Sequence, residues 1–270
     1  MSKNSNSFSI PTHMQGAVLW EVNKPLIVEN DIEIPALDYG QVLVKIAYSG
    51  VCHSQLMEAR GKRGKDRYLP HLLGHEGSGE VIAIGAGVSK VSVGDWVILG
   101  WIKGKGKDVG GAKYSLGERV INSGSVTTFS TYSIVPENRI VTIPLNVPKD
   151  IAVLFGCAVP TGAGMILNEI KPQRGSSIVF FGLGGIGLSA LMACRIFECD
   201  PVIAIDISQE KLVLAQNFGA THLINSSNQD PVKKVLKITE GRGVDYSVEA
   251  AGRTETIEMA FGMVRRNGGK

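Results

Sequence analysis

The sequence lacks the features of several common protein classes. Residues 1–7 are polar and contain no apolar core of a secretory signal, so we expect a cytoplasmic protein. The formal net charge is only +3 and no long basic block occurs, which argues against a nucleic-acid partner. An uncharged run over residues 179–194 is too short for a membrane span and is rich in glycine, so we expect no membrane insertion.

Cysteine is scarce, with four residues in a chain of 270: Cys52, Cys157, Cys194 and Cys199. Four cysteines without an export signal argue against a disulfide framework and favour metal binding or packing. Hydrophobic residues make up 44% and charged residues 20%, which is ordinary for a folded globular protein and excludes a disordered chain. The length is sufficient for two domains.

The spacing of apolar residues changes near Pro144. Before it, short alternating or apolar runs separated by turn residues predict a mostly β, barrel-like unit. These runs cover residues 16–20, 41–47, 80–84, 96–99 and 129–135. Helical spacing begins after Pro144, and we place the first domain at residues 1–158 and the second at residues 159–270.

Strands alternate with helices in the second half. Predicted strands lie at residues 177–181, 202–206, 222–225 and 244–249, and predicted helices at 188–197, 209–218 and 232–239. Such alternation is typical of a parallel, doubly wound α/β sheet.

A glycine-rich turn follows the first of these strands. Gly182, Gly184 and Gly187, with Gly185 between them, fit the G-x-G-x-x-G pattern, whose backbone approaches a dinucleotide pyrophosphate closely. Asp206 closes the second strand, where an acid can bind ribose hydroxyls and repel a 2′-phosphate. We therefore expect NAD rather than NADP. The alternative is that Asp206 only stabilises the start of the following helix.

Residues suited to a metal occur in three separate segments. His75 and Glu76 lie in Gly74-His75-Glu76-Gly77-Ser78-Gly79, while Cys52 lies upstream and Cys157 downstream. Two thiolates and one imidazole would leave one coordination position of zinc open, as in catalytic sites. The spacing G-H-E-x2-G-x5-G-x2-V resembles the signature of the zinc-containing alcohol dehydrogenases in the medium-chain dehydrogenase/reductase superfamily.

This resemblance implies a GroES-like β-barrel catalytic domain followed by a Rossmann domain, with Cys52, His75 and Cys157 as zinc ligands. It further implies roles for residues around the reaction: Ser54 as proton relay, Glu76 near the zinc, Thr161 near the nicotinamide, Trp101 in the substrate pocket, His53 at the pyrophosphate and Lys211 at the adenosine ribose. Each also has a plain structural alternative, such as a loop-capping serine, a buried acid, an exposed or core tryptophan, or a solvated lysine.

The chain departs from the family pattern at several positions. Four clustered cysteines that hold a structural zinc in many relatives are absent between Cys52 and Cys157, so we expect one catalytic zinc and no structural one. The equivalent stretch is residues 103–111, which we predict to be a flexible basic loop. Gln55 replaces an acid that orients the zinc histidine, and Met57 replaces a relay histidine. An amide can still hydrogen-bond the imidazole.

The chain stops where relatives form a fifth strand, so we expect an incomplete, C-terminally truncated Rossmann sheet with an unpaired edge at residues 244–249. The resemblance implies a homo-oligomer for a full-length form and leaves the oligomeric state of this chain open.

We expect an NAD-dependent oxidoreductase that transfers hydride between NAD and a primary alcohol or aldehyde. One alternative is an inactive fragment that binds zinc or nucleotide without turnover. Another is a zinc-free quinone or enone reductase of the same superfamily. The basic segment at residues 60–67 either favours anionic substrates or is simply a solvated loop.

Overall fold

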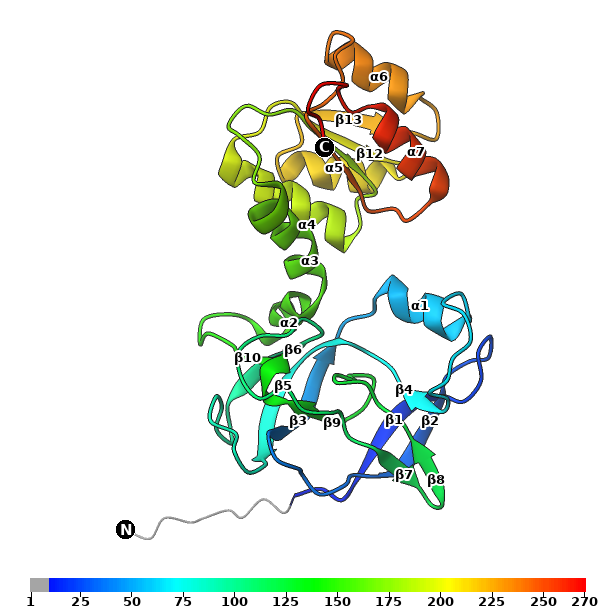
Figure 1. Ribbon diagram of the computed structural model, residues 1–270, viewed down its shortest axis with the longest axis vertical. Helices are drawn as coiled ribbons and strands as arrows, with labels where there is room; N and C mark the ends of the chain where they lie inside the picture. Colours follow the sequence, from blue (N-terminus) through cyan, green and yellow to red (C-terminus); the bar gives the residue numbers. More distant parts are fainter. Residues whose placement is uncertain (1–9) are drawn as a thin grey trace. The chain divides into compact units, whose positions relative to one another are not determined.

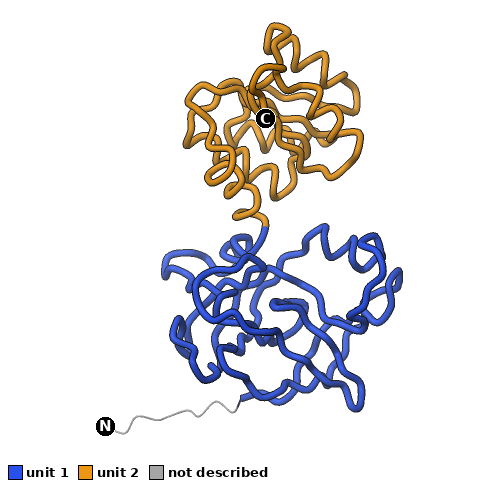
Figure 2. Tube along the Cα trace, viewed as in Figure 1, with its two compact units in different colours: residues 1–157 blue, residues 158–270 orange. Residues whose placement is uncertain are grey.

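The computed structural model describes residues 10–270, which fold into two compact units divided after Cys157 (Figures 1 and 2). The polar start, from which we expected a cytoplasmic location, lies outside the described residues. No single helix within residues 10–270 is long and apolar enough to cross a membrane. The consecutive helical segments Lys149–Gly156 and Ala158–Ile170 meet that requirement only when they are counted together.

Two antiparallel five-stranded sheets make up the first unit (Figure 1). The first has the order β4-β1-β2-β7-β8, with β1 His13–Leu19, β2 Ile27–Glu33, β4 His71–Leu72, β7 Tyr114–Leu116 and β8 Arg119–Ile121. The second has the order β10-β6-β5-β3-β9, with β3 Gln41–Ser49, β5 Glu76–Ile84, β6 Trp96–Gly100, β9 Tyr132–Pro136 and β10 Ile140–Thr142. The expectation of a mostly β unit is therefore confirmed.

Strand β3 shows why these residues form a sheet with two covered faces. Leu43 packs into a core that also contains residues of β1, β2 and β7. Val42 and Val44, which point the opposite way, pack into a second core with Val97 and Leu99 of β6. The period of two residues thus places alternate side chains in two different cores.

Short helices complete the first unit. They are α1 His53–Ala59, η1 Glu137–Arg139, α2 Lys149–Ala152 and η2 Val153–Gly156. Helix α1 and the segment that follows η2 carry residues of the candidate site.

The basic loop at residues 103–111, which we expected to be flexible, is joined to the rest of the first unit by hydrogen bonds. Glu137 is buried and accepts backbone N–H bonds from Ser89 and Lys90, both at 2.6 Å, and from Lys107 at 2.9 Å. Burial raises the pKa of this carboxyl, but the hydrogen bonds from these amides outweigh burial and hold the pKa below its ordinary value. One carboxylate therefore fastens the loop to its neighbours.

The second unit contains a parallel four-stranded sheet of order β13-β12-β11-β14. Its strands are β11 Ile178–Phe181, β12 Val202–Asp206, β13 His222–Asn225 and β14 Tyr246–Glu249. Its helical segments are α3 Ala158–Gly164, the π-helix η3 Met165–Ile170, α4 Gly185–Cys194, η4 Arg195–Phe197, α5 Gln209–Asn217, α6 Pro231–Ile238 and α7 Thr254–Gly262. The expected doubly wound order is confirmed.

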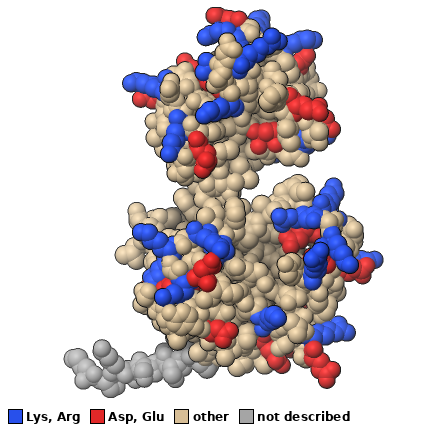
Figure 3. All heavy atoms as spheres, in the orientation of Figure 1, with Lys and Arg blue, Asp and Glu red and all other residues tan. Residues whose placement is uncertain are grey.

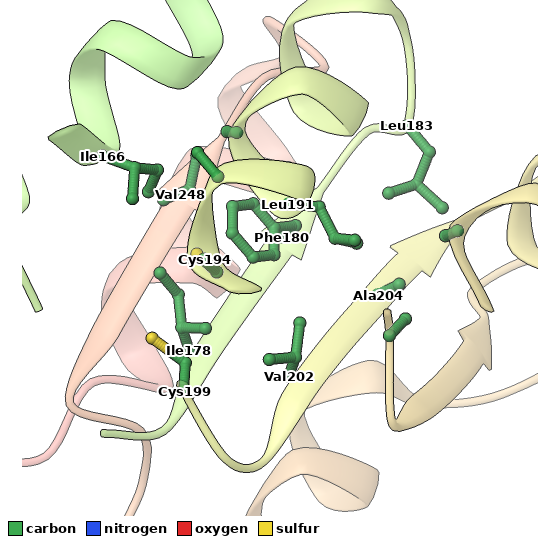
Figure 4. Packing of buried hydrophobic residues seen from close by; sticks show 14 of the residues in the cluster. Ile166, Ile178, Phe180, Leu183, Leu191, Cys194, Cys199, Val202, Ala204 and Val248 are labelled. Carbon is green, nitrogen blue, oxygen red and sulfur yellow. The ribbon is translucent and has the colours of Figure 1, made fainter. Parts of the chain in front are cut away.

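Both faces of this sheet are covered by helices. On one face, Phe180 of β11 packs with Leu191 of α4 and Val248 of β14 (Figure 4). On the other face, Val179 and Phe181 pack against residues of α6 and α7. A strand that is buried on both faces needs apolar side chains at every position. The continuous apolar run of β11 predicted such a strand from the sequence.

The outer edge of β14 differs from our expectation of an unpaired edge. Ser247 N–H donates to the carbonyl of Lys270 at 2.9 Å, and Lys270 N–H donates to the carbonyl of Asp245 at 2.9 Å. Val244 lies outside the strand and forms an isolated bridge with Val264. The final residue of the chain therefore covers part of this edge.

Charged side chains are mixed on the face of the two units that Figure 3 shows. Lys and Arg are interspersed with Asp and Glu on each unit. This arrangement agrees with the low formal net charge of +3.

Candidate metal centre and nucleotide site

The structure brings the three predicted metal ligands together within the first unit. Cys52 is the N-cap of α1, His75 immediately precedes β5, and Cys157 follows η2. Their ligand atoms all lie within 4.8 Å of one another, and His75 Nε2 is 3.1 Å from Cys157 Sγ. Residues more than one hundred positions apart in the sequence thus converge on one point.

The chemistry of these donors fits zinc. Two sulfur atoms and one imidazole suit a borderline-soft divalent ion, and three protein ligands leave a position for a reactant. Burial, and next the positive charge of Arg63, lower the pKa of His75, so its ring is neutral near pH 7. A neutral imidazole is the form that coordinates a metal.

Glu76 lies between two glycines that adjoin the cysteines. A Cβ on Gly50 would stand 2.0 Å from Glu76 Oε1, and a Cβ on Gly156 would stand 2.8 Å from Glu76 Cβ. Gly50 precedes Cys52 by two residues, and Gly156 directly precedes Cys157. The absence of side chains at these positions makes room for the buried carboxylate of Glu76 beside the backbone that carries both thiols.

The amide of Gln55 joins two of the ligands. Its Oε1 accepts from the backbone N–H of Cys52 at 2.9 Å, and its Nε2 lies 2.6 Å from His75 Nδ1. The hydrogen bond to the imidazole that we expected of this amide is therefore present. Gln55 is 5% exposed, so water does not compete freely for these contacts.

The remaining predicted residues of the first unit have different environments. Ser54, in the first turn of α1, has a buried Oγ without a hydrogen-bond partner among the described residues. His53 is exposed at the start of α1. Trp101 follows β6 and is 50% exposed, and its carbonyl accepts a hydrogen bond from Arg139. The roles of these three residues stay predictions.

A second group of possible metal ligands lies near α1, and our sequence reasoning did not find it. His71 donates from Nδ1 to the carbonyl of Leu72, while its Nε2 is 2.8 Å from Asp66 Oδ2 and 3.9 Å from Glu58 Oε1. Arg63 also pairs with Glu58 at 3.6 Å. The hydrogen bonds of His71 and the ion pair of Arg63 with Glu58 account for the polar atoms of this group, so we explain it as a polar network that holds the basic segment.

The glycine turn of the second unit has the geometry that its pattern predicts. Gly182 adopts a φ of +82°, which favours glycine. A Cβ on Gly187 would lie 1.9 Å from the carbonyl oxygen of Gly182, so the third glycine permits close packing of α4 on the turn. Gly184 is the N-cap of α4, and a Cβ there would meet nothing within 4 Å. Gly185 begins the helix.

A cavity of about 310 Å³ opens beside this turn. Its lining includes Gly182, Gly184, Asp206 and Lys211. Asp206 Oδ2 accepts from the N–H of Leu183 at 2.7 Å, and its Oδ1 accepts from the N–H of Ser208 at 2.9 Å. Each carboxylate oxygen keeps capacity to accept a further hydrogen bond from a ligand.

The structure adds residues to this cavity that the sequence did not indicate. Arg253 and Thr256, at the start of α7, and Ser226, after β13, contribute to the lining. They follow β13 and β14, the two outer strands of the sheet, so no short sequence pattern unites them. Thr161 lies in α3, and its Oγ1 is buried without a partner among the described residues.

Two protein families match the chain. The family described as alcohol dehydrogenase GroES-like domain matches residues 38–145, and the family described as zinc-binding dehydrogenase matches residues 185–269. A curated relative, an S-(hydroxymethyl)glutathione dehydrogenase of Synechocystis sp., is 36% identical. That alignment covers 95% of this chain and 76% of the relative.

Solved structures agree with these matches. Benzyl alcohol dehydrogenase from Acinetobacter calcoaceticus is 31% identical with a TM-score of 0.83, covering 95% of this chain and 75% of that one. An alcohol dehydrogenase from Aeropyrum pernix is 27% identical with a TM-score of 0.79, covering 94% and 76% of the two chains. These likenesses confirm the expected GroES-like and Rossmann architectures.

Proposed function

Because this chain belongs to the zinc-containing alcohol dehydrogenase family of the medium-chain dehydrogenase/reductase superfamily, we propose that it transfers hydride between a primary alcohol or aldehyde and NAD. The observation that carries this proposal is the convergence of Cys52, His75 and Cys157 within 4.8 Å. These three residues would hold one zinc ion. When bound, zinc acts as a Lewis acid on an alcohol or aldehyde oxygen, and the nicotinamide carries the hydride.

The buried polar groups near the ligands support a role in moving a proton. Ser54 Oγ is buried and lacks a partner among the described residues, so it can accept a hydrogen bond from the alcohol hydroxyl and relay the proton by passing its own hydrogen on to water. Glu76 is 4% exposed beside the ligand segments, so an ionised carboxylate there would add negative charge to the site. We propose that Ser54 moves the proton and that Glu76 tunes the charge of the site.

The cavity of the second unit supports NAD as the cofactor. The glycine turn can approach a pyrophosphate closely, and the Asp206 carboxylate can accept hydrogen bonds from ribose hydroxyls while repelling a 2′-phosphate. Lys211 lines the same cavity, which supports the proposal that it binds the ribose. Thr161 next to the nicotinamide, His53 at the pyrophosphate and Trp101 at the substrate complete the proposed set.

The class of substrate is proposed from the relatives. Their names state activity on S-(hydroxymethyl)glutathione and on benzyl alcohol, each of which carries a primary hydroxyl. A small molecule with a primary hydroxyl or aldehyde group therefore suits this chain. The zinc-free reductase is disfavoured because the complete set of two thiols and one imidazole is assembled.

Metal analysis combined with a hydride-transfer assay tests this function. We expect one zinc per purified 270-residue chain and formation of NADH when the chain is mixed with NAD and a panel of primary alcohols. Turnover by this chain would also exclude the inactive-fragment alternative. Absence of zinc from freshly purified protein, or enone reduction without metal, would contradict the proposal.

A further inference from the structure

The orientation of the Gln55 amide follows from the backbone around it. The N–H of Cys52 can only donate, and it lies 2.9 Å from the atom assigned as Gln55 Oε1. Turning the amide over would place its NH2 group against this N–H, so that two donors would face each other. The Gln55 oxygen therefore faces Cys52, and the NH2 group faces His75, whose Nδ1 is 2.6 Å away.

This orientation decides which ring nitrogen of His75 carries the hydrogen. An amide NH2 only donates, so Nδ1 of a neutral ring must accept and cannot carry a hydrogen. The hydrogen then resides on Nε2, which lies 3.1 Å from Cys157 Sγ. The ring nitrogen that faces the thiol group is therefore a donor.

A metal requires the opposite arrangement. Nε2 is the nitrogen that lies within the group of ligand atoms, and coordination uses its lone pair. The hydrogen must then move to Nδ1, where metal-ligating histidines usually donate to a carboxylate or a carbonyl. In this chain Nδ1 faces a donor instead.

We propose that Gln55 is a positioning residue that weakens zinc binding by holding His75 in the ring form that does not coordinate. Loading the metal requires the amide to turn its oxygen toward Nδ1, which disturbs the bond to the Cys52 N–H. A carboxylate avoids this conflict because it has an acceptor oxygen for each of the two N–H groups. This inference rests on the proposed zinc site.

The isosteric substitution Gln55→Glu tests the proposal. It replaces the NH2 group by an acceptor and preserves the length of the side chain. We expect the variant to bind Zn²⁺ about 10- to 100-fold more tightly than the wild type, measured by competition with a chromophoric chelator. Equal zinc affinity in the two proteins would overturn the proposal.

A second readout separates the ring form from a simple effect of charge. In the metal-free wild type, ¹⁵N chemical shifts should show the hydrogen of His75 on Nε2, and in Gln55→Glu they should show it on Nδ1. The chain has five histidines, and His75→Asn identifies the signal by its loss. Tighter zinc binding by Gln55→Glu without this change of ring form would contradict the proposal.

Gln216→Glu provides a matched control, because it makes the same substitution at an exposed position of α5 in the second unit. Its zinc affinity and the His75 ring signals should equal those of the wild type; a comparable gain in affinity would show a general charge effect and overturn the proposal. If neither protein binds zinc, the proposed function fails, while the ring signals of the metal-free proteins still decide the inference about Gln55.

Discussion

The two candidate sites use backbone and side chains to different extents. The metal centre draws its ligands from three segments that are far apart in the sequence, and side chains complete it. The nucleotide cavity lies at the ends of the four parallel strands of one sheet, and the backbone of the glycine turn after β11 forms one side of it. The glycine turn depends on the steric fit of its backbone, whereas the metal centre depends on each segment that positions a ligand side chain.

The hydrogen bonds that position the residues of each site also differ. Gln55 connects His75 to the backbone of Cys52, so the ligands are coupled through side-chain hydrogen bonds. In the cavity, backbone N–H groups of Leu183 and Ser208 hold the carboxylate of Asp206. Substitutions should therefore affect metal binding and nucleotide binding separately.

The largest expected effect is the loss of a thiol ligand. Cys157→Ser should release most of the zinc on dialysis and lower kcat/KM about 10³-fold, which corresponds to about 4 kcal/mol, because a hydroxyl is a poor ligand for zinc. Metal analysis and steady-state kinetics measure both. Cys194→Ala, in the core of the second unit, should retain its zinc. A Cys157→Ser protein with a full zinc content would contradict the assignment of the ligands.

Two glycines of the turn should give different results. Gly187→Ala should lower the free energy of unfolding by about 1–3 kcal/mol and weaken NADH binding, because the new Cβ would lie 1.9 Å from a carbonyl oxygen. Gly184→Ala should cost less than about 1 kcal/mol, since the new Cβ would meet nothing within 4 Å beyond its neighbours in the chain, yet it should still weaken NADH binding.

Urea unfolding and NADH fluorescence titration measure these two quantities. Gly262→Ala, at the end of α7 with open space around it, should change neither by much. Normal NADH binding by both turn variants would show that this cavity is not the nucleotide site.

Asp206→Asn should raise the dissociation constant of NADH about tenfold and reduce the discrimination against NADPH, because a charged acceptor is lost. Titration with both nucleotides measures the ratio of their affinities. Glu210→Gln makes the same charge change at an exposed position of α5 and should leave the ratio unchanged. An unchanged ratio in Asp206→Asn would favour its alternative role at the helix start.

The smallest expected effect concerns acid stability of the first unit. The folded pKa of Glu137 is below its ordinary value, so its contribution to stability is present above the unfolded pKa of about 4.3 and is lost as the pH falls through the folded pKa. The free energy of unfolding should decline there with a slope from this group of at most about 1.4 kcal/mol per pH unit.

Glu137→Gln should flatten this decline in urea unfolding series between pH 3 and pH 6, whereas Glu118→Gln, on an exposed turn, should keep the slope of the wild type. An identical slope in all three proteins would show that Glu137 does not control acid stability.

The loop that Glu137 holds shows where sequence reasoning was incomplete. The basic composition of residues 103–111 favoured a flexible loop. Glu137 lies well downstream, and nothing in its neighbourhood marks it as the acceptor for Ser89, Lys90 and Lys107. Such contacts arise when sheets pack, and they leave no local pattern.

The sequence by itself determined the class of each unit, the glycine turn and the three residues proposed to hold zinc. Alternating apolar residues and short apolar runs predict strands because they reflect the local geometry of the backbone. The glycine turn and the proposed zinc ligands were found because their motifs have a fixed spacing along the chain. Only the tertiary structure decided that the three ligands meet, that Gln55 presents a donor to His75, and that Lys270 covers part of the edge of β14. These facts depend on distances and hydrogen-bond directions between segments far apart in the chain, which a linear pattern does not encode.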